Sequence, residues 1–461
     1  MSNVPMTRPE EMLIEHKTRY FTSSTFAELD DGRILRQAYG EFSTSEDGGI
    51  TWSEPFQRWD TEGNLVDGHA LVKLSGRGVG LVGKLGKPPA APYGETREQK
   101  TKRLAKLRAA RAKGTGPYLV FWRSDDAGET WEAPVRIAPN GVGSFDNSIV
   151  RTSSGRLLMP VEYGIGQRHG FDPSKKPTTG RIVDGQFLGV SGHYFDPLFG
   201  AVYSVYSDDE GRTWDRNEDG DLIIMLDWST TYSYVFEPTL AEAAPGVILM
   251  VMRTGLGRLF QAWSHDDGQT WTRPQPSPFA ASTTPGAICS LPSTGHLLLI
   301  WNQEGEEEVK LGLSRTCVSA AISRNGGSVW EFFQNVESMH ERTRVEPPPI
   351  RPLRPEEMVF QPGIAAPERD PRYIREGDFF GRWSYPTVTA FEDRVFITHS
   401  YTTFEPHPTK AEMVQRGGPR SMLKPGDFNG KLKVLPISWF YGGKEPADNP
   451  FLPRALDPAV P

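Results

Sequence analysis

The sequence has little that would place the protein in a membrane or in an oxidising compartment. Only two cysteines occur, Cys289 and Cys317, so no disulfide framework is needed and both are expected to be reduced thiols in the core. No run approaches the roughly 18 apolar residues of a membrane-spanning helix, and the first residues lack the apolar segment of a signal peptide. The simplest expectation is a cytoplasmic protein with no membrane partner.

The charge balance argues against a further class of protein. The chain has 51 Lys and Arg against 58 Asp and Glu, a formal net charge of −7, whereas nucleic-acid-binding domains show a basic footprint. The nine histidines do not form a set at metal-ligand spacing. We therefore expect no nucleic-acid partner, no metal and no cofactor.

What the sequence does contain is a repeated motif of the form Ser-x-Asp-x-Gly-x-Thr-Trp. Full copies begin at Ser45, Ser124, Ser207 and Ser264, and a fifth, at Ser323, has Asn for Asp and Val for Thr. These residue types suit a hairpin turn, because Ser and Asp side chains can accept backbone N–H groups and Gly supplies a positive φ. The spacing between copies suits a four-stranded unit with loops of variable length. Such a repeat predicts units arranged radially around a central axis.

Between the motifs, the chain repeats an inner strand, a tight turn, a second apolar strand and a motif-bearing hairpin. Inner strands are expected to begin near residues 22, 68, 145, 236, 285 and 383. Six such units predict an all-β fold, a six-bladed β-propeller that forms a single domain over residues 1–461. Residues 12–20 could add the outer strand of the sixth blade, which would close the ring and hide the strand edges.

Three insertions interrupt this pattern, at about residues 85–115, 164–200 and 337–378. Residues 97–113 carry Ala and Leu at helical spacing among many Lys and Arg, which predicts a helix. The helix could be a solvated surface element, or a lid that faces a polyanion. Long insertions on a propeller usually lie on a loop face, where functional loops are found.

The leading ends of the inner strands of a propeller converge on a central funnel, so residues at those ends are candidate site residues. They are Thr22, His69, Asp146, Asn147, Glu237 and Tyr385. The His, Asp and Glu can transfer protons, the Tyr is a potential nucleophile, and the Asn could bind a substrate.

The repeated motif resembles the Asp box of the sialidase (neuraminidase) superfamily, the BNR-repeat proteins, in which a six-bladed propeller carries the box at its outer rim. The segment around Glu237, followed by a strand that ends at Arg253, is similar to a family segment. There the Glu deprotonates a catalytic Tyr, and the Arg binds the carboxylate of the substrate. The resemblance places Arg315 as another carboxylate-binding Arg and Tyr385 as the nucleophile.

The resemblance implies an exo-acting glycoside hydrolase that removes a terminal sugar, expected to be acidic, so that the partner is a carbohydrate. Thr22 stands where the family has its first carboxylate-binding Arg, and Arg19 is the nearest arginine on its N-terminal side. The stretch between residues 35 and 45 lacks the Asp-bearing loop that supplies the family's acid/base. Asp146 and His69 are therefore the first candidates for that role, with Glu41 after them.

Other interpretations stay open. In a polysaccharide lyase, His69 or Tyr385 would abstract the proton α to a uronate carboxylate and an Arg would neutralise the developing charge. A glycan-binding propeller would use the same funnel without cleavage. Asp146 could also serve only to bind turn amides, His69 could be a core histidine, and Arg19 could be a solvated surface residue.

Overall fold

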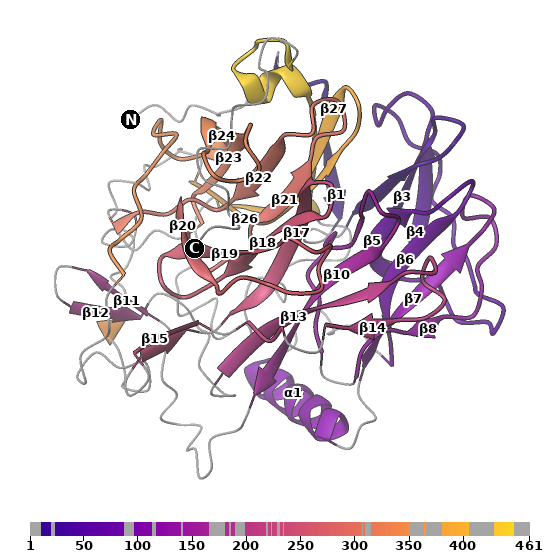
Figure 1. The fold of residues 1–461 in the computed structure, drawn as a ribbon, viewed down its shortest axis with the longest axis horizontal. Coiled ribbons are helices and arrows are strands. Elements are labelled where there is room, and N and C mark those ends of the chain that lie inside the picture. The colour runs from indigo at the N-terminus through magenta and orange to yellow at the C-terminus, as the bar shows by residue number, and fades with distance from the viewer. Residues whose placement is uncertain are drawn as a thin grey trace.

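The described part of the chain forms a ring of β-sheets (Figure 1). The computed structural model describes residues 11–19, 24–86, 96–112, 117–139, 142–165, 180–183, 186–189, 199–217, 220–222, 224–227, 231–233, 235–306, 308, 315–350, 364–365, 380–404 and 428–446. The fold is a six-bladed β-propeller with almost no helix, as the repeated motif predicts.

Each blade is an antiparallel sheet whose first strand contacts the first strand of a neighbouring blade. The first strands are β2 (Thr25–Glu28), β5 (Gly68–Lys73), β9 (Val150–Arg151), β17 (Phe236–Ala244), β21 (Ala287–Ser290) and β26 (Phe380–Ala390). The second strands are β3 (Ile34–Ala38), β6 (Val79–Leu85), β10 (Leu157–Ile165), β18 (Val247–Arg253), β22 (Leu297–Trp301) and β27 (Arg394–Phe404). The third strands are β4 (Glu41–Ser45), β7 (Tyr118–Ser124), β13 (Phe199–Ser207), β19 (Arg258–Ser264), β23 (Cys317–Ser323) and β28 (Phe428–Pro436).

Outer strands complete five of the six blades. They are β8 (Val135–Arg136), β14 (Asp215–Arg216), β20 (Gln275–Ala280), β24 (Glu331–Ser338) and, in the sixth blade, β1 (Ile14–Arg19). The first blade has three strands in its sheet, and Phe42 and Phe56 form an isolated bridge where an outer strand would begin. The third inner strand starts later than expected, because Asn147 adopts a positive φ of 56° and breaks the extended backbone before Val150.

Each motif copy forms the turn between the third strand of its blade and the chain that follows. In the copy that begins at Ser264, Asp266 accepts hydrogen bonds from the N–H and hydroxyl groups of Thr270 (2.8 and 2.5 Å) and from the Ser264 hydroxyl (2.7 Å). Gly268 has a φ of +85°, where a Cβ would also lie 2.6 Å from a carbon of Leu158. The motif therefore acts locally, as a clamp on a hairpin.

Removing this clamp should have a measurable effect on stability. We expect Asp266→Ala to lower the free energy of unfolding by about 1–3 kcal/mol, because three hydrogen bonds to one carboxylate are lost. His265→Ala is the control, since that exposed neighbour lies in the same turn. Urea denaturation of the two variants checks this, and equal stabilities would show that the clamp is dispensable.

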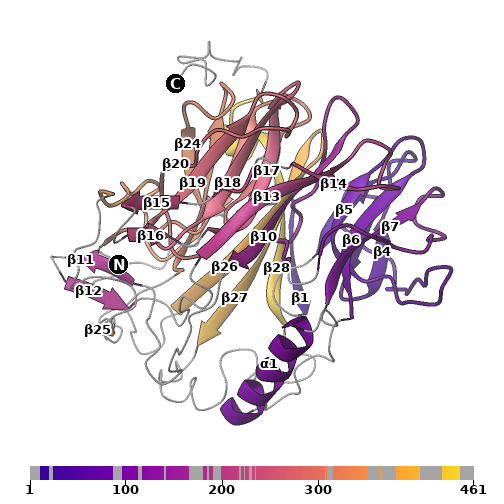
Figure 2. The ribbon, with the colours of Figure 1, turned by 60° about the horizontal axis from the view of Figure 1, so that its bottom comes forward.

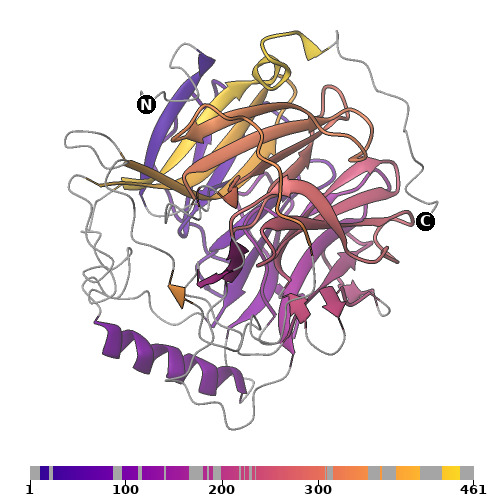
Figure 3. The same ribbon diagram turned by 90° about the vertical axis from the view of Figure 1, so that its left-hand side faces the viewer.

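The ring closes between the two ends of the chain. Strand β1 pairs antiparallel with β28, with Ile14 opposite Val434, and Figures 2 and 3 show the indigo N-terminal strand beside the yellow C-terminal one. This confirms the predicted closure, which covers the outer edge of β28. The Glu15 carboxylate lies 3.3 Å from Lys431 Nζ, so an ion pair supports the seam.

Elements outside the blades come from the three insertions and from residues 224–233. The predicted helix is confirmed as α1 (Arg97–Ala112), and two small sheets are formed by β11 (Gly180–Val183), β12 (Gln186–Gly189) and β25 (Ile364–Ala365), and by β15 (Ile224–Asp227) with β16 (Thr231–Ser233). No helix in the described ranges is both long and apolar enough to cross a membrane.

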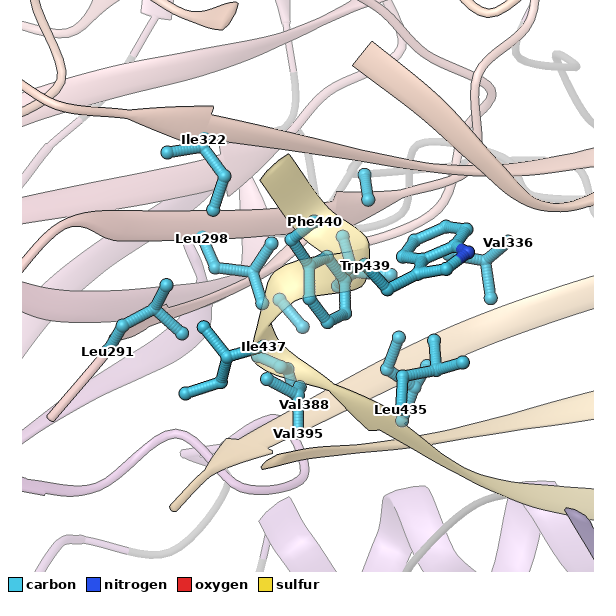
Figure 4. Packing of buried hydrophobic residues seen from close by; sticks show 14 of the residues in the cluster. Leu291, Leu298, Ile322, Val336, Val388, Val395, Leu435, Ile437, Trp439 and Phe440 are labelled. Atoms are coloured by element: carbon cyan, nitrogen blue, oxygen red, sulfur yellow. The ribbon is translucent and has the colours of Figure 1, made fainter. Parts of the chain in front are cut away.

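The core lies between adjacent blades. Between the fifth and sixth blades, the short 3-10 helix η6 (Ile437–Tyr441) inserts Ile437 and Phe440 among Leu298, Val388 and Val395 (Figure 4). Neither cysteine is in a disulfide, and Cys317 is buried among these strands. Burial raises the pKa of the Cys317 thiol to about 11, so it stays protonated at neutral pH.

Candidate active site

The candidate residues gather on the face of the ring opposite the motif turns. In the fourth blade, Ile248 at the start of β18 pairs with the motif residue Ser264, whereas Arg253 at the end of β18 pairs with Phe236 at the start of β17. Glu237 follows Phe236 directly. Helix α1 follows a second strand in the same way, and Figure 2 shows it on the side toward which β27 points. The site residues and helix α1 therefore share one face.

Three predicted site residues form one hydrogen-bonded group. Nη1 of Arg253 donates to Oε2 of Glu237 and to the hydroxyl oxygen of Tyr385, the latter at 3.2 Å. The Arg253 guanidinium lies 4.1 Å from the ring centroid of Phe236, and the residue is 1% exposed. Strand pairing within the fourth blade sets Glu237 beside Arg253, and the sixth blade supplies Tyr385.

Arg253 also has donors that the described residues leave unused. Its Nε and Nη2 are buried and have no hydrogen-bond partner among the described residues. Burial alone would lower the pKa of Arg253, but the charge of Glu237 and the hydrogen bonds to Glu237 and Tyr385 raise that pKa overall. A buried, charged guanidinium with two unmet N–H groups suits an anionic oxygen ligand.

Arg315 also lies near the phenol ring of Tyr385. Its Nη1 donates to the Ser384 hydroxyl (2.8 Å) and its Nη2 to the backbone oxygen of Thr283 (3.1 Å). Its guanidinium is 5.2 Å from the ring centroid of Tyr385, and that of Arg253 is 5.9 Å away. Burial lowers the pKa of Arg315, but an arginine remains charged in proteins. Two cations thus face one phenol.

The backbone at the candidate site is strained. Glu237, Arg315, Tyr385 and Asn147 have φ values of 46°, 61°, 56° and 56°, in the left-handed region that few non-glycine residues adopt. Such conformations persist where the surrounding structure enforces them, and they cluster at functional sites. The motif turns adopt the same conformation at Ala127, Glu210 and Asp267, so the positive φ shows that the surrounding structure enforces the backbone and does not by itself assign a catalytic role.

Asn147 is held by the protein itself. Its Nδ2 donates to the backbone oxygen of Val388 (2.6 Å) and to the Thr389 hydroxyl (2.9 Å), and its Oδ1 accepts from the Thr25 hydroxyl (3.1 Å). Both amide hydrogens are thereby used, so the side chain links the first, third and sixth blades. This geometry suits a connector between blades better than the predicted substrate ligand.

The two acid/base candidates from the sequence lie at the border of the site. His69 is buried, and its Nε2 lies 2.6 Å from the Ser144 hydroxyl. Asp146 is half-buried and follows Phe145, whose ring centroid is 6.2 Å from that of Tyr385. Their acid/base roles stay predictions. The backbone of Arg19, in β1, pairs with that of Phe428 in β28. The side chain of Arg19 and the whole of Thr22 lie outside the described structure.

Sequence reasoning missed one carboxylate, Glu162 in β10. Its Oε2 accepts a hydrogen bond from the backbone N–H of Glu237. Burial, with repulsion from the Glu237 carboxylate as the next cause, raises the pKa of Glu162 to about 7. The available signal was that Glu162 is the one acidic residue in β10 and directly follows the apolar residues 157–161. Among the described residues, no group of three or more His, Cys, Asp or Glu side chains could hold a metal ion.

Comparison with known proteins agrees with this architecture. Residues 105–397 match the family described as the BNR repeat-like domain. Among solved structures, the chain is similar to the NanB sialidase from Streptococcus pneumoniae, with 12% identity, a TM-score of 0.51, and coverage of 93% of this chain and 71% of that one. At this identity, the likeness shows a shared fold.

Two further structures are similar over most of this chain. A mutant Trypanosoma rangeli sialidase displaying trans-sialidase activity has 12% identity and a TM-score of 0.49, with coverage of 95% of this chain and 59% of that one. A Hadza microbial sialidase has 13% identity and a TM-score of 0.47, with coverage of 91% and 66%. The chain thus spans about two thirds or less of the length of these two proteins.

Proposed function

Because the chain belongs to the BNR repeat-like family of the sialidase superfamily, we propose that it is an exo-acting glycoside hydrolase that removes a terminal acidic sugar from an oligosaccharide or glycoconjugate. The observation that carries the proposal is the hydrogen-bonded group of Arg253, Glu237 and Tyr385. It unites, from two blades, a phenol, a carboxylate and a cation.

This group can activate a phenol. A neutral phenol, with an unperturbed pKa of about 10, is a poor nucleophile until a base takes its proton. Glu237 is the base, and Arg253 stabilises negative charge on both oxygens to which it donates. A tyrosine suits an anomeric centre that bears a carboxylate, since a negatively charged nucleophile would be repelled there.

The reaction then takes two steps. The Tyr385 oxygen attacks the anomeric carbon as its proton passes to Glu237, and the glycosidic oxygen leaves with a proton from a general acid. Water next attacks the glycosyl-tyrosine and gives a proton to the conjugate base of that acid, while the Tyr385 oxygen leaves and regains its proton from Glu237. The anomeric configuration is retained after two displacements.

The arginines support an acidic substrate. Nε and Nη2 of Arg253 are two neighbouring donors in one plane, which match the two oxygens of a carboxylate. Arg315 adds a second positive charge near the same phenol. A neutral sugar would leave these buried donors unmet.

The test is turnover of nitrophenyl glycosides of N-acetylneuraminic acid, glucuronic acid and galacturonic acid, with galactose and arabinose as neutral controls. We expect release of nitrophenol from an acidic glycoside and little from the neutral ones. An unsaturated product that absorbs in the near ultraviolet, formed from a uronate oligosaccharide, would instead indicate the lyase. Calorimetric binding of these sugars without any turnover would indicate a glycan-binding propeller.

A further inference from the structure

We propose that Glu162 is the general acid/base of this site, the group that exchanges a proton with the glycosidic oxygen and with water. The inference rests on the proposed hydrolase function and assigns a further catalytic residue to it. It gives Glu162 the role for which the sequence offered Asp146 and His69. The sequence alone did not indicate that a carboxylate in β10, the second strand of the third blade, lies at the site.

The position of Glu162 is fixed by the backbone on both sides. Glu162 and Gly143 exchange backbone hydrogen bonds of 2.9 and 2.8 Å, and Glu162 also pairs with Val202 in β13. Its Oε2 accepts from the backbone N–H of Glu237, so the carboxyl group of Glu162 is held against the backbone of the proposed base. A carboxyl group held in this way is pre-organised for proton transfer.

The second carboxyl oxygen of Glu162, Oε1, lies close to the backbone of Gly143. A Cβ added at Gly143 would lie 2.8 Å from Oε1 of Glu162, so only glycine leaves this oxygen its space. No described residue donates a hydrogen bond to Oε1. The buried polar atoms without a partner in the described residues do not include Oε1 either, so this oxygen is not sealed in the core. Oε1 is therefore the atom that can carry the transferable proton.

The two carboxyl groups have different partners. Glu237 forms an ion pair with the buried guanidinium of Arg253. Burial and then repulsion from the Glu237 carboxylate raise the pKa of Glu162 to about 7, against the smaller opposing effects of the Glu237 N–H and of the charges of Lys84 and Arg253. A carboxyl group whose pKa is raised by its surroundings can act as a general acid near neutral pH.

The proposed steps balance with those of Tyr385. The proton on Oε1 of Glu162 moves to the glycosidic oxygen as the bond from that oxygen to the anomeric carbon breaks. The resulting carboxylate then takes a proton from the water that attacks the glycosyl-tyrosine, which restores the acid. Because the first step needs protonated Glu162, kcat/KM should fall as the pH rises through about 7.

The variant Glu162→Gln, compared on two leaving groups of the same acidic sugar, tests the assignment. Hydrolysis of the phenyl glycoside should fall about 10²- to 10⁴-fold, since its leaving group needs a proton. The first step with the dinitrophenyl glycoside should change far less, since that group leaves unprotonated, and the fall of kcat/KM near pH 7 should disappear. Equal losses on both substrates would assign Glu162 a merely structural role and overturn the proposal.

A second variant and a direct measurement guard against misinterpretation. Gly143→Ala should reproduce the loss on the phenyl glycoside by displacing Oε1, while Glu54→Gln, at an exposed site in the first blade, should behave as wild type. A carboxylic acid infrared band that titrates near pH 7 should vanish in Glu162→Gln and persist in Glu54→Gln. A band unaffected by Glu162→Gln would overturn the inference alone, whereas a wild type inactive on every glycoside would overturn the proposed function and the catalytic role with it.

Discussion

Tyr385→Phe is expected to lower kcat by at least about a thousand-fold on the acidic aryl glycoside that the wild type turns over. The change removes the one oxygen that Arg253 and Glu237 are arranged to activate. The ring stays, together with its contacts with Phe145 and the guanidinium of Arg315. Loss of the hydroxyl should therefore affect the chemistry far more than the fold.

The comparison variant is Tyr206→Phe. Tyr206 lies in β13, where its ring stacks on Arg156 at the motif face of the propeller. We expect unchanged turnover in this variant and similar urea denaturation midpoints for both. A Tyr385→Phe protein with wild-type kcat would remove Tyr385 as the nucleophile, and would leave Glu162 and Glu237 as a two-carboxylate site.

Glu337→Gln is expected to be the most damaging single change to stability, with a loss of about 3–5 kcal/mol in the free energy of unfolding. Glu337 is 5% exposed, and its Oε1 lies 2.9 Å from Lys433 Nζ, 3.1 Å from Lys431 Nζ and 3.6 Å from His399 Nε2. The residue joins β24 of the fifth blade to β27 and β28 of the sixth. Without its charge, buried ammonium groups at the closing seam lose a counter-ion.

The same cluster predicts the sign of a pH effect. Burial opposes ionisation of Glu337, but the charges of Lys433 and Lys431 lower its pKa overall. Its contribution is therefore present above the pKa of the unfolded chain, about 4.3, and is lost as the pH falls through the lower pKa of the folded state. Burial lowers the pKa of His399 from 6.5 to about 3, so the unfolded chain binds this proton first as the pH falls, and the effect on stability has the same sign as that of Glu337.

A double variant separates the ion cluster from general packing damage. Adding Lys433→Met to Glu337→Gln should recover part of the lost stability, because it removes a buried cation that has lost its 2.9 Å contact with the Glu337 carboxylate. Glu331→Gln is the comparison, since its pair with Arg324 is more exposed and should contribute less than about 1 kcal/mol. Strictly additive losses in the double variant, measured by urea denaturation, would refute the coupling.

Much of the fold could be predicted because its signals are local. The hydrogen bonds of the motif join residues within four positions of each other, as Thr270 and Asp266 show, so each turn can be identified from a short segment. The alternation of apolar segments and turns then sets the number of blades. The funnel positions Glu237 and Tyr385 followed from the same repetition, since both stand near the leading ends of inner strands.

The site itself needed contacts that the chain order does not contain. Asn147 was predicted to bind substrate, but its amide is used by Thr25 and by residues 388 and 389, which come from two other blades. Glu162 was not singled out, because a glutamate in a second strand has no distinctive neighbours along the chain. Its contact with Glu237 exists only across the seam between the third and fourth blades.

The sequence by itself determined the six-bladed ring, the place of the motif turns and the residue types that reach the funnel, because these depend on strand periodicity and on turns that form within a few residues. Only the tertiary structure decided which of those residues meet and which carboxyl group holds a proton near neutral pH. A pKa depends on burial and on charges a few ångströms away, and in Glu162 both come from segments far apart in the chain.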